Sequence, residues 1–126
     1  MLLGIGTDIV EVDRIRRALD RWGRRFERRV YTPAERAYCG RKKNGYDCWA
    51  GRFAAKEAVL KALGTGRDGA GFADVEVLSD NLGRPSVVLK GRAQVMAQNR
   101  GVSRVLVSIA HDAGSAVAFA VMEGEG

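Results

Sequence analysis

The chain has 126 residues, of which 46% are hydrophobic and 29% are charged, so the composition predicts a single globular domain over residues 1–126. No stretch approaches the ~18 apolar residues that a membrane helix needs. The opening MLLGIGTDIV lacks a basic region and is interrupted by Asp8, which argues against a signal peptide or a membrane anchor.

Positive charge is concentrated in the first half of the chain. Residues 1–67 hold 16 of the 21 Lys and Arg residues and 8 of the 15 Asp and Glu residues, whereas residues 68–126 hold 5 and 7. This asymmetry indicates a polyanionic partner or substrate for the N-terminal half. Two cysteines, Cys39 and Cys48, lie in neither a metal-binding nor a redox spacing, and we expect reduced thiols in a cytoplasmic protein.

Residues 2–10 alternate as a β-strand does. One face carries Leu3, Ile5, Thr7 and Ile9. The other face carries Gly4, Gly6 and Asp8, and a face without side chains at its glycines lets another element approach the backbone closely.

Residues 13–30 predict a helix in which Gly23 is the candidate break. Its apolar stripe consists of Val12, Ile15, Leu19, Trp22 and Phe26. A basic stripe beside it consists of Arg14, Arg17, Arg21, Arg25 and Arg28. A solvated face is the simpler interpretation, but eight arginines between residues 14 and 29 are opposed only by Asp20 and Glu27, which favours a binding surface.

The segment Thr32-Pro33-Ala34-Glu35 matches a capping box with Pro at the first helical position, so a helix begins there. Asp47 is the expected N-cap of the next helix, which ends at Gly64. On a helical wheel of residues 49–63, large apolar side chains occupy one side and Ala and Gly the other. We therefore expect a buried central helix, and an oligomer that helps to cover both of its sides.

In the later part of the chain, the hydrophobic pattern changes from a repeat of 3.6 residues to a repeat of two, which is typical of β-strands. The expected strands are residues 74–80, 85–89, 105–111 and 116–122. The first two flank a turn and form a hairpin, and a short helix over 93–99 ends at Gly101. Helices that come first and strands that come late favour an α+β fold, with an antiparallel-rich sheet packed on the long central helix.

Four charged residues interrupt the central helix: Arg52, Lys56, Glu57 and Lys61. Burying a charge is costly unless the charge is paired or bound to a ligand. Glu57 and Lys61 are one turn apart, so they could form a surface ion pair or belong to a site. The sequence leaves both alternatives open.

Three motifs resemble those of the small phosphopantetheinyl transferases. FAAKEAVLKALGTG, residues 53–66, is similar to the family signature. GIGTDI, residues 4–9, followed by Arg14-Ile15, resembles the N-terminal motif of the holo-acyl-carrier-protein synthases in that family. SIAHD, residues 108–112, resembles a late motif in which Ala110 replaces a more usual hydroxyl residue. The motifs have the family's order, and the resemblance covers the whole chain.

The resemblance implies transfer of 4′-phosphopantetheine from coenzyme A to a serine of apo acyl carrier protein, a step of fatty acid biosynthesis that releases adenosine 3′,5′-bisphosphate. It implies that Asp8 and Glu57 bind Mg²⁺, that Lys61 contacts phosphate, and that Glu57 and Lys61 are catalytic. It also implies the α+β phosphopantetheinyl transferase fold and a homotrimer with active sites between subunits.

The residue chemistry agrees with these roles. Mg²⁺ is usually held by one or two carboxylates together with substrate phosphates. Phosphoryl transfer depends mainly on positioning and charge stabilisation, so no protein nucleophile is required. Either Glu57 or a water on the metal could be the general base, and the sequence does not separate them.

The predicted coenzyme A ligands are basic residues, the glycine-rich helix exit, whose backbone N–H groups could cradle a phosphate, and the single histidine. They are Lys42, Lys43, Arg52, Lys56, Lys61, Gly64, Thr65, Gly66 and His111. A histidine at the end of a strand is more usually structural or exposed, so this alternative for His111 stays open.

The predicted docking surface for the acidic carrier protein is the basic stripe of Arg14, Arg17, Arg21, Arg25 and Arg28. A nucleic-acid-binding module is the competing interpretation of so basic a segment. The sequence has no zinc spacing, no RNP-like aromatic motif and no recognisable helix-turn-helix, so we expect no nucleic acid partner.

Overall fold

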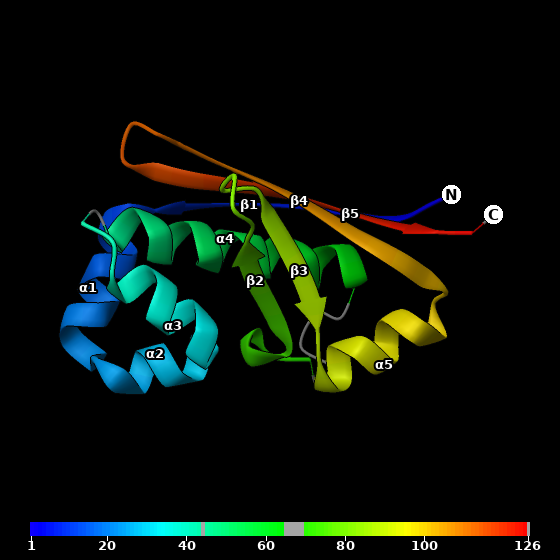
Figure 1. Ribbon diagram of the computed structural model, residues 1–126, viewed down its shortest axis with the longest axis horizontal. Coiled ribbons are helices and arrows are strands. Elements are labelled where there is room, and N and C mark those ends of the chain that lie inside the picture. Colours follow the sequence, from blue (N-terminus) through cyan, green and yellow to red (C-terminus); the bar gives the residue numbers. More distant parts are fainter. Residues whose placement is uncertain (44, 65–69, 126) are drawn as a thin grey trace.

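The computed structural model describes residues 1–43, 45–64 and 70–125. A three-stranded antiparallel sheet, in the order β1-β5-β4, lies along one side of the molecule, and the long helix α4 runs beneath it (Figure 1). The strands are β1 (Leu2–Glu11), β4 (Val102–Asp112) and β5 (Ser115–Gly124), and α4 spans Gly45–Leu63. The predicted α+β class is confirmed.

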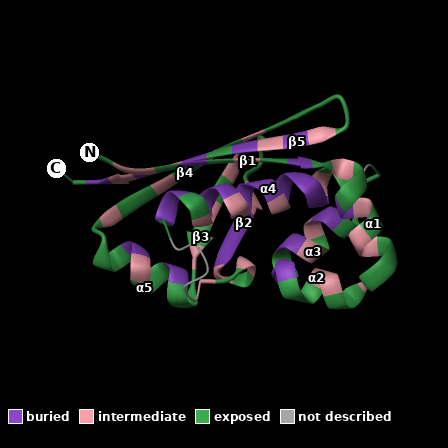
Figure 2. Ribbon diagram, turned by 180° about the vertical axis from the view of Figure 1, so that it is seen from behind, coloured by how far each residue is buried: buried purple, intermediate pink, exposed green. Residues whose placement is uncertain are grey.

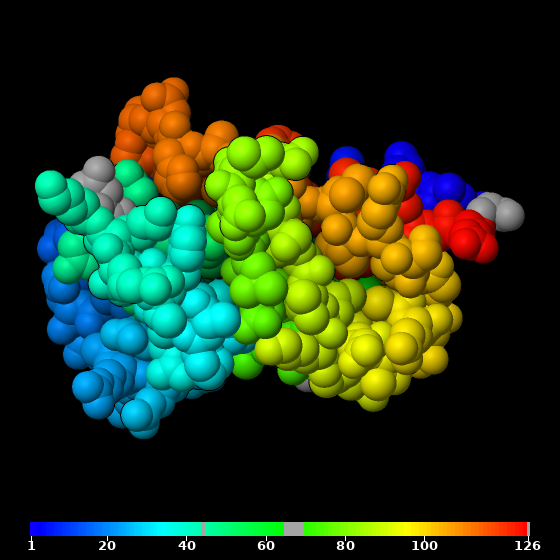
Figure 3. Space-filling view, in the orientation of Figure 1, coloured from blue at the N-terminus to red at the C-terminus, as the bar shows by residue number. Residues whose placement is uncertain are grey.

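Three short helices lie together at one end of the molecule (Figure 1), and their residues, coloured blue to cyan, fill that end of the surface (Figure 3). They are α1 (Val12–Trp22), α2 (Arg24–Val30) and α3 (Pro33–Gly40). Gly23 separates the first two with a φ of 54°, a left-handed conformation that favours glycine, so the predicted break is confirmed. The capping box is also confirmed, because Glu35 N donates to Thr32 Oγ1 at 3.3 Å and Thr32 N donates to Glu35 Oε1 at 2.8 Å.

Two expectations at this end are wrong. Helix α4 begins at Gly45, so Asp47 lies inside the first turn and is not the N-cap. Trp22, a member of the predicted apolar stripe, is 50% exposed, whereas Phe26 beyond the turn at Gly23 packs against the core. The indole of Trp22 instead lies beneath the guanidinium of Arg21, at 4.9 Å.

A two-stranded hairpin lies between the α1–α3 end and α5 (Figure 1). Its strands are β2 (Val75–Ser79) and β3 (Pro85–Leu89), preceded by the 3₁₀ turn η1 (Phe72–Asp74) and followed by α5 (Gly91–Asn99). The hairpin and the short helix are as predicted, although α5 begins two residues earlier than residue 93.

Strand β1 packs directly on the backbone of α4. A Cβ atom at Gly4 would lie 2.1 Å from the carbonyl oxygen of Ala62, and one at Gly6 would lie 2.0 Å from that of Ala58. Any side chain at either glycine would push the strand away from the helix. The close approach predicted for this face is therefore confirmed, and the approaching element is α4.

The two faces of the sheet differ in their cover. On the inner face, the side chains of β5 that meet α4 are fully buried: Ala116, Ala118, Ala120 and Met122. The small side of α4 is thus covered within one chain. The expectation that a second chain helps to cover this side is wrong. The outer face is apolar and carries no described element (Figures 1 and 2), with Ile5 74% exposed and Ile9 69% exposed.

A disulfide joins the last turn of α3 to the first turn of α4. It links Cys39 to Cys48, whose Cα atoms are 5.5 Å apart. The expectation of two reduced thiols is therefore wrong. The pairing depends on how the chain folds back between the two helices, which the spacing of the cysteines does not reveal.

Replacing both cysteines with serine is expected to lower the free energy of unfolding by about 2–3 kcal/mol, because the unfolded chain regains the freedom of a short closed loop. Denaturant unfolding of the oxidised protein and of the double variant measures this difference. Alkylation of the unfolded protein without reductant counts its free thiols, and two free thiols would contradict the bond.

Among the described residues, no helix is long and apolar enough to cross a membrane.

Candidate functional site

Asp8 and Lys61 meet where β1 packs on α4. Asp8 lies two residues beyond Gly6, on the face of β1 that touches the helix. The ammonium of Lys61 donates to Asp8 Oδ1 and to the carbonyl oxygen of Thr7, both at 3.1 Å. The Asp8 side chain is only 15% exposed, whereas that of Lys61 is 53% exposed. The close packing of the glycines thus places a carboxylate within reach of a cation on α4.

Glu57 is a second carboxylate beside this pair. It lies one turn before Lys61 on α4 and is partly buried. Burial raises the pKa of the Glu57 carboxyl, and the negative charge of Asp8 raises it further, while the positive charges of Lys61 and Arg14 act against this. We call Asp8, Glu57 and Lys61 the Asp8–Lys61 site. Lys61 forms its ion pair with Asp8. It does not form the alternative surface ion pair with Glu57.

The donor set of this site fits a magnesium ion. Burial is the main cause that raises the pKa of Glu57, and repulsion from the Asp8 carboxylate adds to it, so a divalent cation would relieve the repulsion between the two carboxylates. Within the described residues, no group of three or more His, Cys, Asp or Glu side chains could hold a metal. A cation held by Asp8 and Glu57 alone would need further oxygen ligands, which is the usual situation of Mg²⁺ with water and substrate phosphates.

Arg52 lies on the side of α4 that faces away from the Asp8–Lys61 site. It lines a cavity of about 170 Å³. The cavity is lined by Cys48, Gly51, Arg52, Ser79, Gly83, Pro85, Ile109 and His111. Arg52 is 7% exposed, and its Nη2 donates to Ser79 Oγ at 2.8 Å, whereas its buried Nε has no hydrogen-bond partner among the described residues. Burial is the main cause that lowers the pKa of Arg52. A buried guanidinium with free N–H groups is suited to bind an anion.

His111 closes one side of this Arg52 cavity. Its Nε2 lies 2.8 Å from the carbonyl oxygen of Asp47, which ties the end of β4 to the first turn of α4. A Cβ atom at Gly51 would lie 3.0 Å from the same nitrogen, so this glycine allows the imidazole to pack against the helix. The histidine is thus both held by the fold and exposed at a cavity.

Lys56 has a structural role that differs from its prediction as a coenzyme A ligand. Its side chain is fully buried, and its ammonium lies 2.7 Å from Glu35 Oε1. It also donates to the carbonyl oxygens of Phe72, at 2.8 Å, and Val75. An enclosed ammonium with three partners cannot reach a ligand in solution, so the prediction for Lys56 is wrong.

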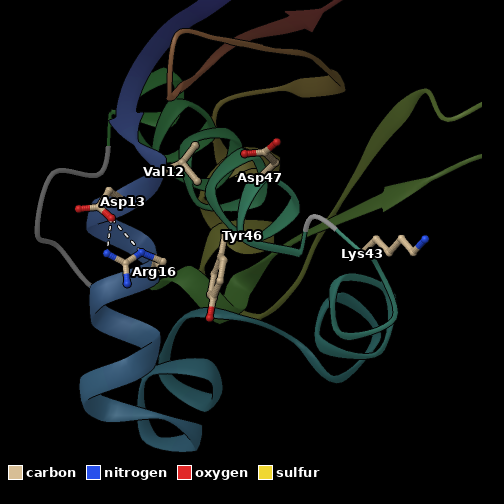
Figure 4. Close-up of a pocket in the computed structure, with 6 residues that line it drawn as sticks. All are labelled: Val12, Asp13, Arg16, Lys43, Tyr46 and Asp47. Carbon is tan, nitrogen blue, oxygen red and sulfur yellow. Dashed lines mark hydrogen bonds and ion pairs between the residues drawn. The ribbon is translucent and has the colours of Figure 1, made fainter.

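Lys42 and Lys43, the two lysines that follow α3, lie in different surroundings. The ammonium of Lys42 lies 4.6 Å from the centre of the Tyr38 ring, over which Arg52 also lies. Lys43 lines a different cavity of about 330 Å³ with Val12, Asp13, Arg16, Tyr46 and Asp47. Figure 4 shows Lys43 pointing away from the Asp13–Arg16 ion pair on α1. Only Lys42 therefore joins the groups around Arg52.

The glycine-rich exit of α4 is described at its first residue only. Gly64 has a φ of 73° and its N–H donates to the carbonyl oxygens of Leu60 and Lys61. Thr65 and Gly66 lie outside the described residues. Arg100, which the sequence did not single out, donates from Nη1 to Leu63 O at 2.5 Å and so caps the end of α4.

The five arginines of the predicted docking surface are all exposed. Arg14, Arg17 and Arg21 lie on α1, whereas Arg25 and Arg28 lie on α2 beyond the turn at Gly23. A cavity of about 270 Å³ is lined by Trp22, Arg25, Phe26 and Arg29. The surface thus bends at Gly23 and combines guanidinium groups with two aromatic rings.

The predicted ligands form two groups in one chain. Asp8, Glu57 and Lys61 lie where α4 meets β1, whereas Arg52 and His111 lie where α4 meets the hairpin and the end of β4. Glu57 and Arg52 are five residues apart, which turns them about 140° around the helix. Ser79 and Tyr38, the direct partners of Arg52, were missed because their roles depend on tertiary contacts.

Comparison with known proteins gives a consistent picture. A model of the 4′-phosphopantetheinyl transferase superfamily matches residues 4–120. The holo-[acyl-carrier-protein] synthase of Halothermothrix orenii is 50% identical over 123 residues, which covers 98% of each chain.

Two solved structures extend the likeness to the fold. The holo-[acyl-carrier-protein] synthase of Neisseria meningitidis has a TM-score of 0.88 at 38% identity, with 98% of this chain and 99% of that chain covered. A holo-(acyl-carrier-protein) synthase from Bacillus anthracis, in complex with CoA (3′,5′-ADP), has a TM-score of 0.81 at 36% identity, with 99% of each chain covered.

Proposed function

Since the chain belongs to the 4′-phosphopantetheinyl transferase superfamily, we propose that the Asp8–Lys61 site and the Arg52 cavity are the two halves of its active site. The enzyme is a holo-[acyl-carrier-protein] synthase, which moves 4′-phosphopantetheine from coenzyme A to a serine of apo acyl carrier protein. The observation that carries the proposal is the meeting of Asp8, Glu57 and Lys61 at the contact between β1 and α4.

The Asp8–Lys61 site performs the transfer. The serine hydroxyl oxygen of the carrier attacks the β-phosphorus of coenzyme A, and the bond from that phosphorus to the bridging oxygen breaks, so that adenosine 3′,5′-bisphosphate leaves. The serine proton needs an acceptor. Glu57 is the proposed acceptor because its carboxylate lies beside Asp8 and Lys61 where the transfer is placed, and the exposed ammonium of Lys61 offsets negative charge on the phosphates.

We assign Mg²⁺ to Asp8 and Glu57 as the cofactor. When bound, the ion would supply positive charge against the pyrophosphate of the substrate. Asp8 is suited to hold it because its carboxylate lies beside Glu57 and remains 15% exposed, so the two residues together supply the hard oxygen ligands that this ion prefers.

The Arg52 cavity is the half that holds the nucleotide end of coenzyme A. The free N–H groups of Arg52 are directed to the 3′-phosphate, and Lys42 adds a second cation beside them. His111 closes the cavity from the end of β4. Lys43 and the helix exit at Gly64, Thr65 and Gly66 remain predicted ligands of the same substrate.

We also infer a homotrimer in which the two halves come from neighbouring subunits. The outer sheet face supports this, because Ile5, Ile9, Phe119 and Leu106 are 44–74% exposed on three adjacent strands. Exposed apolar patches of this kind mark protein–protein contacts.

Replacing Ile5 with Lys is expected to separate the subunits and abolish transfer, because a charge at the centre of an apolar interface leaves that charge without water or a partner. Sedimentation equilibrium measures the assembly. Val95→Lys on α5 is the matched control, since Val95 is an exposed apolar residue at 46% on a different surface. A monomeric parent protein at working concentration would contradict the trimer.

The arginine surface of α1 and α2 is proposed to dock the acidic carrier protein. Reversing the charges of Arg17 and Arg21 is expected to raise the KM for the carrier about tenfold and to reduce its salt sensitivity, because exposed charges act mainly on association. The Kd for coenzyme A should not change. Arg92→Glu on α5 is the control, as it reverses an equally exposed charge elsewhere. An equal rise in the KM for the carrier and in the Kd for coenzyme A would place these arginines in the nucleotide site instead.

Incubation of the purified protein with apo carrier protein, coenzyme A and Mg²⁺ tests the proposed function. Mass spectrometry should find a gain on the carrier equal to one phosphopantetheine group, located on a serine. An unmodified carrier, together with a shift of DNA or RNA in electrophoresis, would favour the competing nucleic-acid-binding module.

A further inference from the structure

Tyr38 lies at the centre of the basic groups around the Arg52 cavity. It belongs to α3 and is half-buried. The centre of its ring is 4.5 Å from the guanidinium carbon of Arg52 and 4.6 Å from Nζ of Lys42. One aromatic ring therefore contacts a cation of α4 and a cation of the segment that follows α3.

Arg52 depends on this ring for its orientation. Its Nη2 donates to Ser79 Oγ at 2.8 Å and its Nε has no hydrogen-bond partner among the described residues, whereas Tyr38 contacts it through both the ring and the hydroxyl group. Stacking on an aromatic ring fixes the plane of a guanidinium. Tyr38 thus determines the direction in which the free N–H groups of Arg52 lie.

The hydroxyl group of Tyr38 connects the same partners. Hydrogen bonding with Lys42, and then with Ser79, lowers the pKa of the Tyr38 hydroxyl. Lys42 and Arg52 carry like charges, so holding them near one ring is unfavourable unless something compensates. The negative face of the ring supplies part of this compensation, and a phosphate dianion, which accepts hydrogen bonds from several cations at once, would supply the rest.

We propose that Tyr38 is a positioning residue that orients Arg52 and Lys42 for the 3′-phosphate of coenzyme A, and that it thereby sets the preference of the enzyme for coenzyme A over 3′-dephospho-coenzyme A. This inference rests on the proposed assignment of the Arg52 cavity to the nucleotide end of the substrate. Tyr38 acts through the two cations and not on the reacting phosphate.

Steady-state kinetics of Tyr38→Leu with the two substrates test the proposal. Loss of the stacking is expected to raise the KM for coenzyme A about tenfold, with kcat and the KM for 3′-dephospho-coenzyme A unchanged. Tyr38→Phe keeps the ring and should lose no more than about threefold in KM. Tyr46→Leu is the matched control, since it removes an exposed tyrosine of α4 whose hydroxyl bonds Asp20, and it should leave the preference unchanged.

The variant Arg52→Gln separates failure of this inference from failure of the proposed function. If Arg52→Gln does not reduce the preference for coenzyme A, the assignment of the cavity is wrong. If it does reduce the preference but Tyr38→Leu does not, only the role of Tyr38 is overturned. Equal loss of kcat/KM for both substrates in Tyr38→Leu would also overturn it, because a merely structural residue would act in that way. Tyr38→Met provides the same test if Tyr38→Leu does not fold.

Discussion

Replacing Asp8 with Asn, or Glu57 with Gln, is expected to lower kcat about 100-fold or more at low millimolar Mg²⁺. A neutral amide binds this hard cation far less well than a carboxylate, and a loss of about 3 kcal/mol of transition-state stabilisation corresponds to that factor. Both substitutions preserve the size of the side chain, so the fold should persist. Initial rates over a range of Mg²⁺ concentrations, with coenzyme A saturating, measure the effect.

Glu11→Gln is the matched control for this pair. Glu11 is an exposed carboxylate on the same strand as Asp8, and neutralising it should leave the dependence on Mg²⁺ unchanged. A variant of Asp8 or Glu57 that keeps near-normal rates would show that the replaced residue is not a ligand of the ion. A loss in the Glu11 variant equal to theirs would mean that net charge, and not coordination, explains the result.

Replacing Lys56 with Met is expected to lower the free energy of unfolding by about 3–5 kcal/mol, the usual cost of leaving one partner of a buried ion pair without the other. Among the residues that the structure describes, Glu35 would keep the backbone N–H groups of Thr32 and Val77 as donors, at 2.8 Å and 2.7 Å. Because the pair joins α3, α4, η1 and β2, its loss should loosen the contacts that hold the hairpin. Denaturant unfolding measures the change.

Lys61→Met provides the comparison for that measurement. It removes the same charge from the same helix, but at an exposed position whose partner is Asp8, so it should cost no more than about 1 kcal/mol. It should nevertheless reduce transfer, since Lys61 belongs to the Asp8–Lys61 site. The double replacement of Glu35 by Gln and Lys56 by Met should recover part of the lost stability. A Lys56→Met protein as stable as the parent would contradict the buried pair.

Local signals in the sequence were sufficient for much of the fold. The capping box at Thr32, the helix end at Gly64 and the break at Gly23 each depend on residues adjacent in the chain, and each is confirmed. The bare glycine face of β1 also identified a close approach correctly, because only the absence of Cβ atoms permits it. Asp47 was misplaced because Gly45 already begins the helix.

The charges of α4 could not be sorted from the sequence. Arg52 and Lys56 lie on the large apolar side of a helical wheel and Lys61 lies at its seam, but the wheel does not show that their partners are Ser79, Glu35 and Asp8 respectively. Each of these partners comes from another element, so no local pattern identifies it. The disulfide, Tyr38 and Arg100 were missed for the same reason, since all three act between segments that only the folded chain brings together.

In the proposed trimer, two groups of residues that are separated within one chain make one active site between subunits. Mixing Asp8→Asn chains with Arg52→Gln chains tests this arrangement most directly, after each variant has been dissociated and the two reassembled together. Rates are compared at a coenzyme A concentration well below the raised KM of the Arg52 variant, where both variants are slow. Some interfaces would then pair an intact Asp8–Lys61 site with an intact Arg52 cavity. Carrier modification should therefore be faster in the mixed assembly than in either variant alone. If the mixture exchanges subunits yet stays as slow as its components, each active site lies within a single chain and the shared site is contradicted.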